Sequence, residues 1–467
     1  MMRCRRSVVV AIYVMLALSL AVPEGPLDAA APNNAPDAAN YWPQWRGPMS
    51  TGVAPHAHPP IEWHESADDE DPKTKNIRWK TQLPGKGHST PVIWGDQVFV
   101  TSAISVGDAF DPKYSEAPGA HDNIPVTHKH RFVVLALHRA DGHLLWQTTV
   151  YEAVPHEGGH YTASHASASP VTDGEHLFAF FGSSGLFCLD LQGQVVWSKE
   201  FGHMQTRHGH GEGGSPAIYG ETLIVNWDHE GRSFVAALNK RTGKELWREP
   251  RDEVTSWATP IVIEHDGSAQ VIISGTQRVR AYDLQSGKVV WSCGGLSRNI
   301  VASPVAAAGM VFAASSYDTR NLLAIRVAGA QGDITETKNV AWTTRQLTPY
   351  VPSPLLYENT LYFLRHYQGI LSRLDVGSGE PITGPLRLNG IRDVYASPVA
   401  ADGRVYITDL AGTTVVLTHD PVPRPLAVNR LCEGISASAA LVGAAMYLRG
   451  SESLYCLADD GAGRRDP

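Results

Sequence analysis

The sequence contains few charged residues, and their balance gives the first exclusion. Only 18% of the 467 residues are Asp, Glu, Lys or Arg, and 39 basic against 47 acidic residues leave a net charge of −8. No cluster of Lys or Arg follows the first few residues. The chain therefore lacks the basic patch that binds a phosphate backbone, and we expect no nucleic-acid partner.

Cysteine is also scarce. There are five cysteines, with no C-x-x-C motif and no adjacent pair. We therefore predict no structural disulfide, even in an oxidising compartment. Cys188 and Cys456 take the place that Ala136, Ala237 and Ala281 hold in similar segments, which predicts that both are small buried strand residues.

The motifs of several enzyme classes are missing as well. The sequence contains no G-x-S-x-G elbow, no phosphate-binding P-loop and no dinucleotide fingerprint between a strand and a helix. These absences favour a protein that is not an enzyme.

Long apolar runs are absent except near the N-terminus. Three arginines precede the apolar stretch 8–22, and small residues follow it. This pattern predicts a signal peptide over 1–31, cleaved after Ala21 or Ala31, and an exported protein that is periplasmic or secreted. An uncleaved membrane anchor is the alternative. No Cys for lipid attachment follows, and we expect no later transmembrane segment.

Glycine and proline are used freely, with 43 and 31 copies, and they indicate many turns. Two apolar runs joined by such a turn recur along the chain, the second run ending in Trp. The copies are "VLALHRADGHLLW" (134–146), "LFCLDLQGQVVW" (186–197), "VAALNKRTGKELW" (235–247) and "VRAYDLQSGKVVW" (279–291). A segment that repeats at a fixed period predicts a repeat architecture.

Ser or Thr followed by Pro begins each repeat. The prolines are at 91, 170, 216, 260, 304, 354 and 398, about 45 residues apart except where an insertion lies near 102–130. A degenerate eighth unit, 436–450, lacks the proline. Proline is tolerated at the first residue of a strand, and a Gly-Asp or Asp-Gly turn then returns the chain. Each repeat thus predicts four antiparallel strands, which make one blade of an all-β propeller.

The last repeat lacks a fourth strand, and the N-terminal part of the chain supplies a candidate. Residues 76–84 show the fourth-strand pattern with Trp79 in place. We predict that this strand completes the last blade and closes an eight-bladed propeller over 76–459. Residues 32–75 would form an N-terminal extension and 460–467 a tail. Tryptophans that end successive blades should wedge between neighbouring sheets: Trp146, Trp197, Trp247, Trp291 and Trp342.

The pattern A-L-D-x-x-T-G-K-x-x-W resembles the tryptophan-docking repeat of the pyrroloquinoline-quinone (PQQ) propeller superfamily. The resemblance covers about residues 76–458, and "WPQWRGP" (42–48), "NWDHEG" (226–231) and "TPYVPSPLLY" (348–357) are similar to exported bacterial, BamB-like propeller proteins of undefined role. The superfamily includes quinoprotein dehydrogenases and the propeller lipoprotein of the outer-membrane β-barrel assembly machine. This chain lacks the adjacent-Cys disulfide of the dehydrogenases and the lipidated Cys of the lipoprotein.

Candidate binding residues follow from the propeller geometry. Residues before each first strand, and residues that join the second and third strands, should meet at one mouth of the axial channel. They are His88, His165, Glu212, Asp228, His229, Trp257, Arg278, Asp318, Tyr350, His366 and Tyr395. The alternative is a polar, hydrated mouth that binds nothing.

Histidines are concentrated in the second and third repeats, which raises the question of a metal site. Imidazole together with carboxylate would suit zinc, copper or nickel, and the candidate ligands are His208, His210, Glu212, Asp228 and His229. The surrounding glycines also fit the alternative, solvated loop histidines.

These observations favour a monomeric binding or scaffold module that presents the channel mouth to a protein or a small ligand, with no cofactor. The first alternative is a PQQ-dependent quinoprotein oxidoreductase in which Glu212 and Asp228 hold the metal. The second is a sugar-active enzyme that uses the same two groups as a carboxylate pair about 5–10 Å apart.

Overall fold

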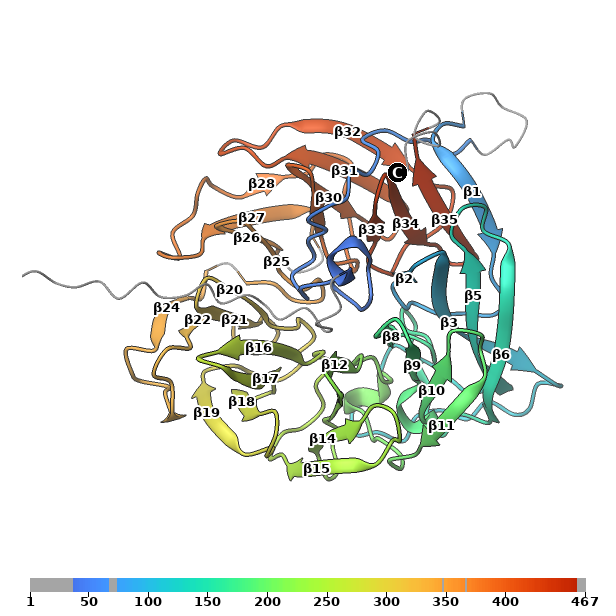
Figure 1. Ribbon diagram of the computed structural model, residues 1–467, viewed down its shortest axis with the longest axis horizontal. Coiled ribbons are helices and arrows are strands. Elements are labelled where there is room, and N and C mark those ends of the chain that lie inside the picture. The colour runs from blue at the N-terminus through green and yellow to red at the C-terminus, as the bar shows by residue number, and fades with distance from the viewer. Residues whose placement is uncertain (1–36, 67–73, 347, 366–367, 460–467) are drawn as a thin grey trace, which may run out of the picture.

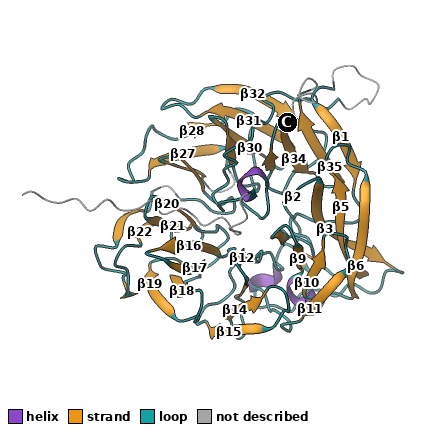
Figure 2. Ribbon diagram, in the orientation of Figure 1, coloured by secondary structure: helices purple, strands orange, loops and turns teal. Residues whose placement is uncertain are grey.

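The computed structural model describes residues 37–66, 74–346, 348–365 and 368–459. Eight sheets stand around a central axis like the blades of a wheel; seven have four strands, and one has a short fifth strand at its outer edge (Figure 1). Strands and loops make up nearly all of the chain, with three short 3-10 turns, η1 (Ala38–Asn40), η2 (Gly182–Ser184) and η3 (Arg207–Gly209) (Figure 2). The predicted eight-bladed all-β propeller is confirmed. The predicted signal peptide, His366 and the tail 460–467 lie outside the described residues.

The blades follow one another along the chain, each starting with its innermost strand. Blade 1 has β2 (Val92–Trp94), β3 (Gln97–Val106), β5 (Lys129–His138) and β6 (Leu144–Ala153); blade 2 has β8 (Val171–Thr172), β9 (His176–Phe180), β10 (Leu186–Asp190) and β11 (Val195–Lys199). Blade 3 has β12 (Ala217–Tyr219), β13 (Thr222–Trp227), β14 (Phe234–Asn239) and β15 (Glu245–Pro250); blade 4 has β16 (Ile261–His265), β17 (Ser268–Ser274), β18 (Arg278–Asp283) and β19 (Val289–Gly294).

The second half of the wheel continues the series. Blade 5 has β20 (Val305–Ala307), β21 (Met310–Ser315), β22 (Asn321–Arg326) and β24 (Val340–Thr344); blade 6 has β25 (Leu355–Tyr357), β26 (Thr360–Leu364), β27 (Ile370–Asp375) and β28 (Leu386–Arg387). Blade 7 has β29 (Val399–Ala401), β30 (Arg404–Thr408), β31 (Thr413–Thr418) and β32 (Pro425–Arg430); blade 8 has β33 (Ala440–Val442), β34 (Ala445–Arg449), β35 (Ser453–Ala458) and β1 (Ile77–Gln82).

A ring of hydroxyl groups links the inner ends of the blades. The Ser or Thr before each first strand accepts a hydrogen bond from the backbone N–H of its counterpart in the preceding blade. For example, Ser215 N donates to Thr259 Oγ1 at 3.1 Å, and Thr259 N donates to Ser303 Oγ at 2.8 Å. Seven such links run from Thr90 to Ser438. The ring is open at the junction between blades 8 and 1, which we call the seam. There the buried Thr90 Oγ1 lacks a partner among the described residues.

The outer strands are linked by docked tryptophans, as the repeats predict. The Trp247 indole N–H donates to Leu284 O of the next blade at 2.8 Å. A Cβ on Gly287, at φ +72°, would lie 2.5 Å from the Trp247 ring, so only glycine fits this turn. Trp79, Trp146, Trp197 and Trp342 make the same contact with the following blade.

Trp291 departs from this pattern. It is fully buried, and its indole N–H donates to Gln270 Oε1 of its own blade at 3.0 Å. The reason lies in blade 5, where the segment between β22 and β24 is longer. Within it, β23 (Gly332–Asp333) pairs in parallel with β19 and covers Trp291.

The N-terminal strand closes the wheel. β1 pairs antiparallel with β35, with Trp79 opposite Cys456 and Lys80 opposite Tyr455 (Figure 1). Pairing of the first strand with the last leaves blade 8 with four strands like the others. Cys188 and Cys456 are buried in β10 and β35, where the repeat pattern predicts small strand residues.

Residues 37–66 cross one end of the central channel, on the side of the turns between first and second strands. They hydrogen-bond to blades 1, 7 and 8 through Ile93, Ala400 and Gly443. Arg46 is 2% exposed and donates to Pro354 O at 2.6 Å and Pro398 O at 2.7 Å. Burial lowers the pKa of Arg46 to about 9. No helix among the described residues is long and apolar enough to cross a membrane.

Candidate functional site

A cavity of about 1000 Å³ opens at the other end of the channel. Most of its lining comes from the loops of blades 1 to 3, and Leu410, Ser436 and Glu452 of blades 7 and 8 complete the axial side. The loops that precede the first strands and those that join second to third strands supply these residues. The cavity therefore lies over one side of the propeller face rather than evenly around the axis.

A lobe of three loops forms the outer wall of the cavity. We call residues 107–128, 154–164 and 202–212 the rim lobe. Its short strands β4 (Asn123–Ile124) and β7 (Gly159–His160) pair with each other. Asn123 Nδ2 donates to His208 O at 2.7 Å, and His160 N donates to His210 O at 3.1 Å. The insertion of blade 1 and the histidine-rich loops of blades 2 and 3 thus form one unit.

Glu212 is the carboxylate at the base of this wall. It accepts hydrogen bonds from the backbone N–H of Ser183, at 2.6 Å, and from the Ser183 hydroxyl. Burial, reinforced by the nearby Glu157, raises the pKa of Glu212 to about 7. A Cβ at Gly182 would overlap the carboxylate, at 1.5 Å from Oε2. Glycine at 182 therefore makes the Glu212 position possible.

A second glutamate and a histidine lie beside Glu212. Glu157 accepts from the hydroxyl and the backbone N–H of Thr206, and burial raises its pKa. His156 Nε2 lies 3.8 Å from Glu212 Oε1 and 4.0 Å from Glu157 Oε2, and it hydrogen-bonds to Met204 O at 2.7 Å. Burial lowers the pKa of His156. Among the described residues, the basic side chain paired with these carboxyl groups is His156, and its lowered pKa makes it a weak counter-charge.

The other histidines of the cavity are held neutral. Burial lowers the pKa of His165 to about 4, helped by His130, whose ring lies 4.9 Å away between centroids. Burial also lowers the pKa of His88 to about 4, with Arg449 and Lys86 adding to the effect. The pKa values of His130 and His160 are lowered too, in both cases first by burial.

Asp228 lines the cavity but is fully engaged in the core. Its two oxygens accept from Arg251 at 2.7 and 3.0 Å, and Oδ2 also accepts from Ser256 Oγ at 2.7 Å. Both members of the Asp228–Arg251 pair have fully buried side chains. Such a pair is a structural element, and the Asp228 oxygens are not open to a ligand.

The candidate residues from the sequence divide into four groups. His88, His165, Glu212, Asp228 and Trp257 line the cavity. Arg278, Asp318, Tyr350 and Tyr395 are not among its lining residues, because blades 4 to 7 contribute only residues 255–257 and Leu410 to it; Arg278 instead pairs with Asp333 at 2.9 Å. His229 is buried, and its ring nitrogens bond to backbone atoms of Gln205, Gly231 and Arg232. His366 lies outside the described residues.

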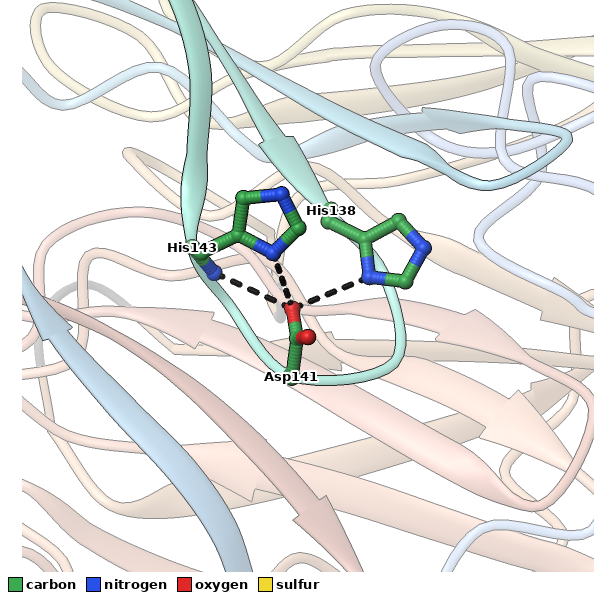
Figure 3. A group of neighbouring side chains, drawn as sticks. All are labelled: His138, Asp141 and His143. Atoms are coloured by element: carbon green, nitrogen blue, oxygen red, sulfur yellow. Dashed lines mark hydrogen bonds and ion pairs between the residues drawn. The ribbon is translucent and has the colours of Figure 1, made fainter.

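The proposed metal ligands do not converge on one point. His208 and His210 belong to the rim lobe, where their rings lie 5.4 Å apart and close to His121. Glu212 and Asp228 are engaged by Ser183 and Arg251. Two other groups among the described residues do bring three ligand atoms together: His138, Asp141 and His143 (Figure 3), and Asp173, Glu175 and His176.

Sequence reasoning missed His130, Glu157 and Ser183 as cavity residues. His156 and His160 were noticed only as part of a histidine-rich run. The motif H-E-G-G-H at 156–160 was the available signal, because it puts a carboxyl and two imidazoles into one glycine-containing loop. Its place in the cavity depends on contacts with the 204–212 loop, which has no repeat counterpart.

Many solved structures resemble this chain, including the following three. BamB from Moraxella catarrhalis is 16% identical with a TM-score of 0.52, covering 78% of this chain and 99% of its own. A quinohemoprotein alcohol dehydrogenase from Pseudomonas putida HK5 is 10% identical with a TM-score of 0.55, covering 94% and 83%. A europium-containing methanol dehydrogenase is 12% identical with a TM-score of 0.55, covering 89% and 90%. At these identities the likeness shows the fold alone.

The family comparison adds sequence evidence. No curated protein matches the chain. The family described as outer membrane protein assembly factor BamB matches residues 70–212, 130–383 and 231–457, three overlapping stretches that span nearly the whole propeller. The chain therefore belongs to this BamB-like family of propellers built from PQQ-type repeats.

Proposed function

We propose that the protein is an exported binding module whose cavity takes an uncharged, hydroxyl-rich small ligand, with carbohydrates as the class that fits best. One observation carries this proposal. The cavity is rich in groups that donate and accept hydrogen bonds, yet these groups carry little net charge at neutral pH.

The lowered pKa values of the histidines produce this neutrality. A neutral imidazole offers one donor and one acceptor, whereas an imidazolium offers only donors. His88, His130 and His165 therefore provide both kinds of partner for hydroxyl groups. Glu212, with a pKa of about 7, is partly protonated and can also donate. The opposite charges of Lys86 and Glu452, which also line the cavity, offset one another.

An aromatic side chain completes the fit. Trp257 lines the cavity and is partly exposed, and its indole N–H is held by Gly211 O at 2.8 Å. The ring is therefore fixed in orientation before a ligand arrives. A fixed aromatic face beside convergent polar groups suits the apolar face and hydroxyl rim of a sugar ring.

The quinoprotein alternative gains little from these residues. The two carboxylates that would hold the metal are occupied, Asp228 by Arg251 and Glu212 by Ser183. PQQ itself carries three carboxylates, and in this cavity it would meet Glu157 and Glu212. The sugar-active enzyme has the same difficulty, because Asp228 is not available as a base or a nucleophile.

A protein partner is the second candidate, supported by the apolar surface of the rim lobe. Phe110, Tyr114, Ile124, Val154 and Tyr161 are large apolar side chains between 38% and 68% exposed. Exposed apolar groups gathered beside a cavity are typical of an interaction surface. A polypeptide that docks there would cover the mouth of the cavity.

Calorimetric titration of the purified protein tests the proposal. The ligands are neutral mono- and oligosaccharides, the corresponding uronic acids and amino sugars, and PQQ with calcium. We expect binding of a neutral sugar, weakened by more than about tenfold in Trp257→Ala because the stacking face is lost. Trp45→Ala, which changes an aromatic residue of the extension at the other end of the channel, is the matched control. Binding of PQQ or of only charged sugars would overturn the proposal.

A further inference from the structure

The turn between β5 and β6 differs from the corresponding turns of the other blades. In blades 2, 3, 4 and 6 the strand before the turn ends in Asn or Asp, whose side chain accepts from the turn's backbone N–H groups; Asn239 and Asp283 are two examples. In blade 1 this position is His138, and a second histidine, His143, takes the place of Lys244 and Lys288. The turn of blade 1 instead has its carboxylate at Asp141, the position of Thr242 in blade 3 and of Ser286 in blade 4.

These three departures bring their side chains to one point. His138 Nδ1 lies 2.9 Å from Asp141 Oδ1, and His143 Nδ1 lies 2.7 Å from the same oxygen (Figure 3). The two imidazole rings stack with their centroids 4.9 Å apart. All three ligand atoms lie within 4.8 Å of one another. Asp141 is 60% exposed and His143 58% exposed, so water and ions reach the group.

The same turn holds the strand that closes the wheel. Trp79 Nε1 of β1 donates to Arg139 O at 3.0 Å, and Thr81 Oγ1 donates to Gly142 O at 2.7 Å. A Cβ at Gly142 would lie 2.5 Å from the Trp79 ring. The residues that receive β1 therefore lie between the two histidines.

We propose that His138, Asp141 and His143 bind a divalent transition-metal ion of the zinc class, and that this ion stabilises the seam between blades 1 and 8. Two imidazoles, one carboxylate and a water molecule make a four-coordinate set that suits Zn²⁺. A tetrahedral ion with bonds of about 2.0–2.1 Å keeps its ligand atoms roughly 3.4 Å apart, so small side-chain movements are enough.

Binding changes the protonation of the two rings. Each Nδ1 must present its lone pair to the metal, so the ring proton resides on Nε2, and any imidazolium releases one proton. Asp141 contributes its carboxylate as the third ligand. The bound ion then ties both ends of the turn to its tip and fixes the surface on which Trp79 docks.

Zinc titration followed by hydrogen exchange of β1 tests the proposal on the metal-free full chain. We expect one high-affinity site. If the ion binds only when β1 is docked on the turn between β5 and β6, the amides of β1 should exchange about tenfold more slowly when free Zn²⁺ is about ten times its Kd. The variant H138N/D141T/H143K, which copies the turn at 239–244, should fold, lose the site and show no zinc effect on β1.

A second variant controls for the other histidines. His210→Ala removes an imidazole from the rim lobe and should keep both the zinc site and the slower exchange of β1. Three outcomes would overturn the proposal: no zinc binding by the unchanged chain, equal binding by the triple variant, or binding that leaves β1 exchange unchanged.

Discussion

Glu212 is a carboxyl group that the folded chain holds in an unfavourable place. It accepts two hydrogen bonds from Ser183, but it lies in the cavity wall beside Glu157, and its basic neighbour His156 has a lowered pKa. Loss of solvent penalises the charged form more than these hydrogen bonds favour it, which raises the pKa to about 7.

The raised pKa of Glu212 predicts a pH-dependent gain from Glu212→Gln. The folded state keeps a proton that the unfolded chain releases, so the carboxyl group destabilises the fold increasingly as pH rises from about 5 to about 8. Glutamine keeps an acceptor for Ser183 and does not ionise. The variant should match the unchanged protein near pH 4 and exceed its free energy of unfolding by about 3 kcal/mol near pH 8.

Urea unfolding at several pH values measures this difference. The buried histidines act in the opposite sense, since their lowered pKa values cost stability as the pH falls below about 6.5. Because both proteins contain the same histidines, subtracting the two curves removes that contribution. A difference that stays constant from about pH 5 to about pH 8 would contradict the assignment.

Individual site residues were predictable only where they follow the repeat. Glu212 and Trp257 precede first strands, and their place at the mouth follows from the blade pattern. Glu157 lies in a loop before a first strand and Ser183 in a loop between second and third strands, but the sequence does not tell which side chains of these loops meet, so their contacts with Thr206 and Glu212 could not be derived from spacing. The same limit applies to Asp228: its position was predictable, but its pairing with Arg251 depends on two side chains packed within the core.

At the scale of the strand, the Ser/Thr-Pro dipeptides do more than begin the first strands. The proline fixes the backbone where no ladder donor is needed. The hydroxyl group before it accepts a hydrogen bond from the backbone N–H of its counterpart in the preceding blade. Without this bond, that N–H would be a buried donor without a partner. The sequence predicted the strand starts but not the hydroxyl ring, because each bond joins residues of different blades.

Two isosteric substitutions distinguish the stability that comes from the hydroxyl ring from the stability that comes from the same residue's place before the first strand. Thr259→Val removes the acceptor of Ser215 N–H and should cost about 1–3 kcal/mol of unfolding free energy. Thr90→Val changes the same side chain at the open link, where Oγ1 has no partner among the described residues. That variant should lie within about 0.5 kcal/mol of the unchanged protein, or be more stable. Denaturant unfolding of both variants gives the comparison, and equal losses would show that the ring contributes nothing.

At the scale of the whole molecule, the wheel depends on a strand that comes from the other end of the chain. The repeat count and the Trp79 pattern predicted the eight blades and this closure, because a repeat lacking one strand needs a partner. The rim lobe could not be predicted, since its insertion has neither the period nor the apolar alternation of a blade. The lobe also places the cavity to one side of the axis. This explains why about half of the candidate binding residues predicted around the channel mouth do not line the cavity.

Substitution of two equivalent tryptophans compares the stability of the seam between blades 8 and 1 with that of the junction between blades 3 and 4. Trp79→Ala and Trp247→Ala each delete an indole that donates to the next blade and packs on a glycine, Gly142 or Gly287. Each should lose about 3–5 kcal/mol locally. Blade 3 stays connected on both sides of Trp247, whereas no turn joins β1 to β35, and β1 is held to blade 8 by strand pairing and side-chain contacts. Trp79→Ala should therefore let β1 detach, expose the edge of β35 and cause concentration-dependent association. Light scattering and hydrogen exchange at 453–458 measure these effects; equal behaviour of the two variants would mean that the seam is no weaker than any other junction between blades.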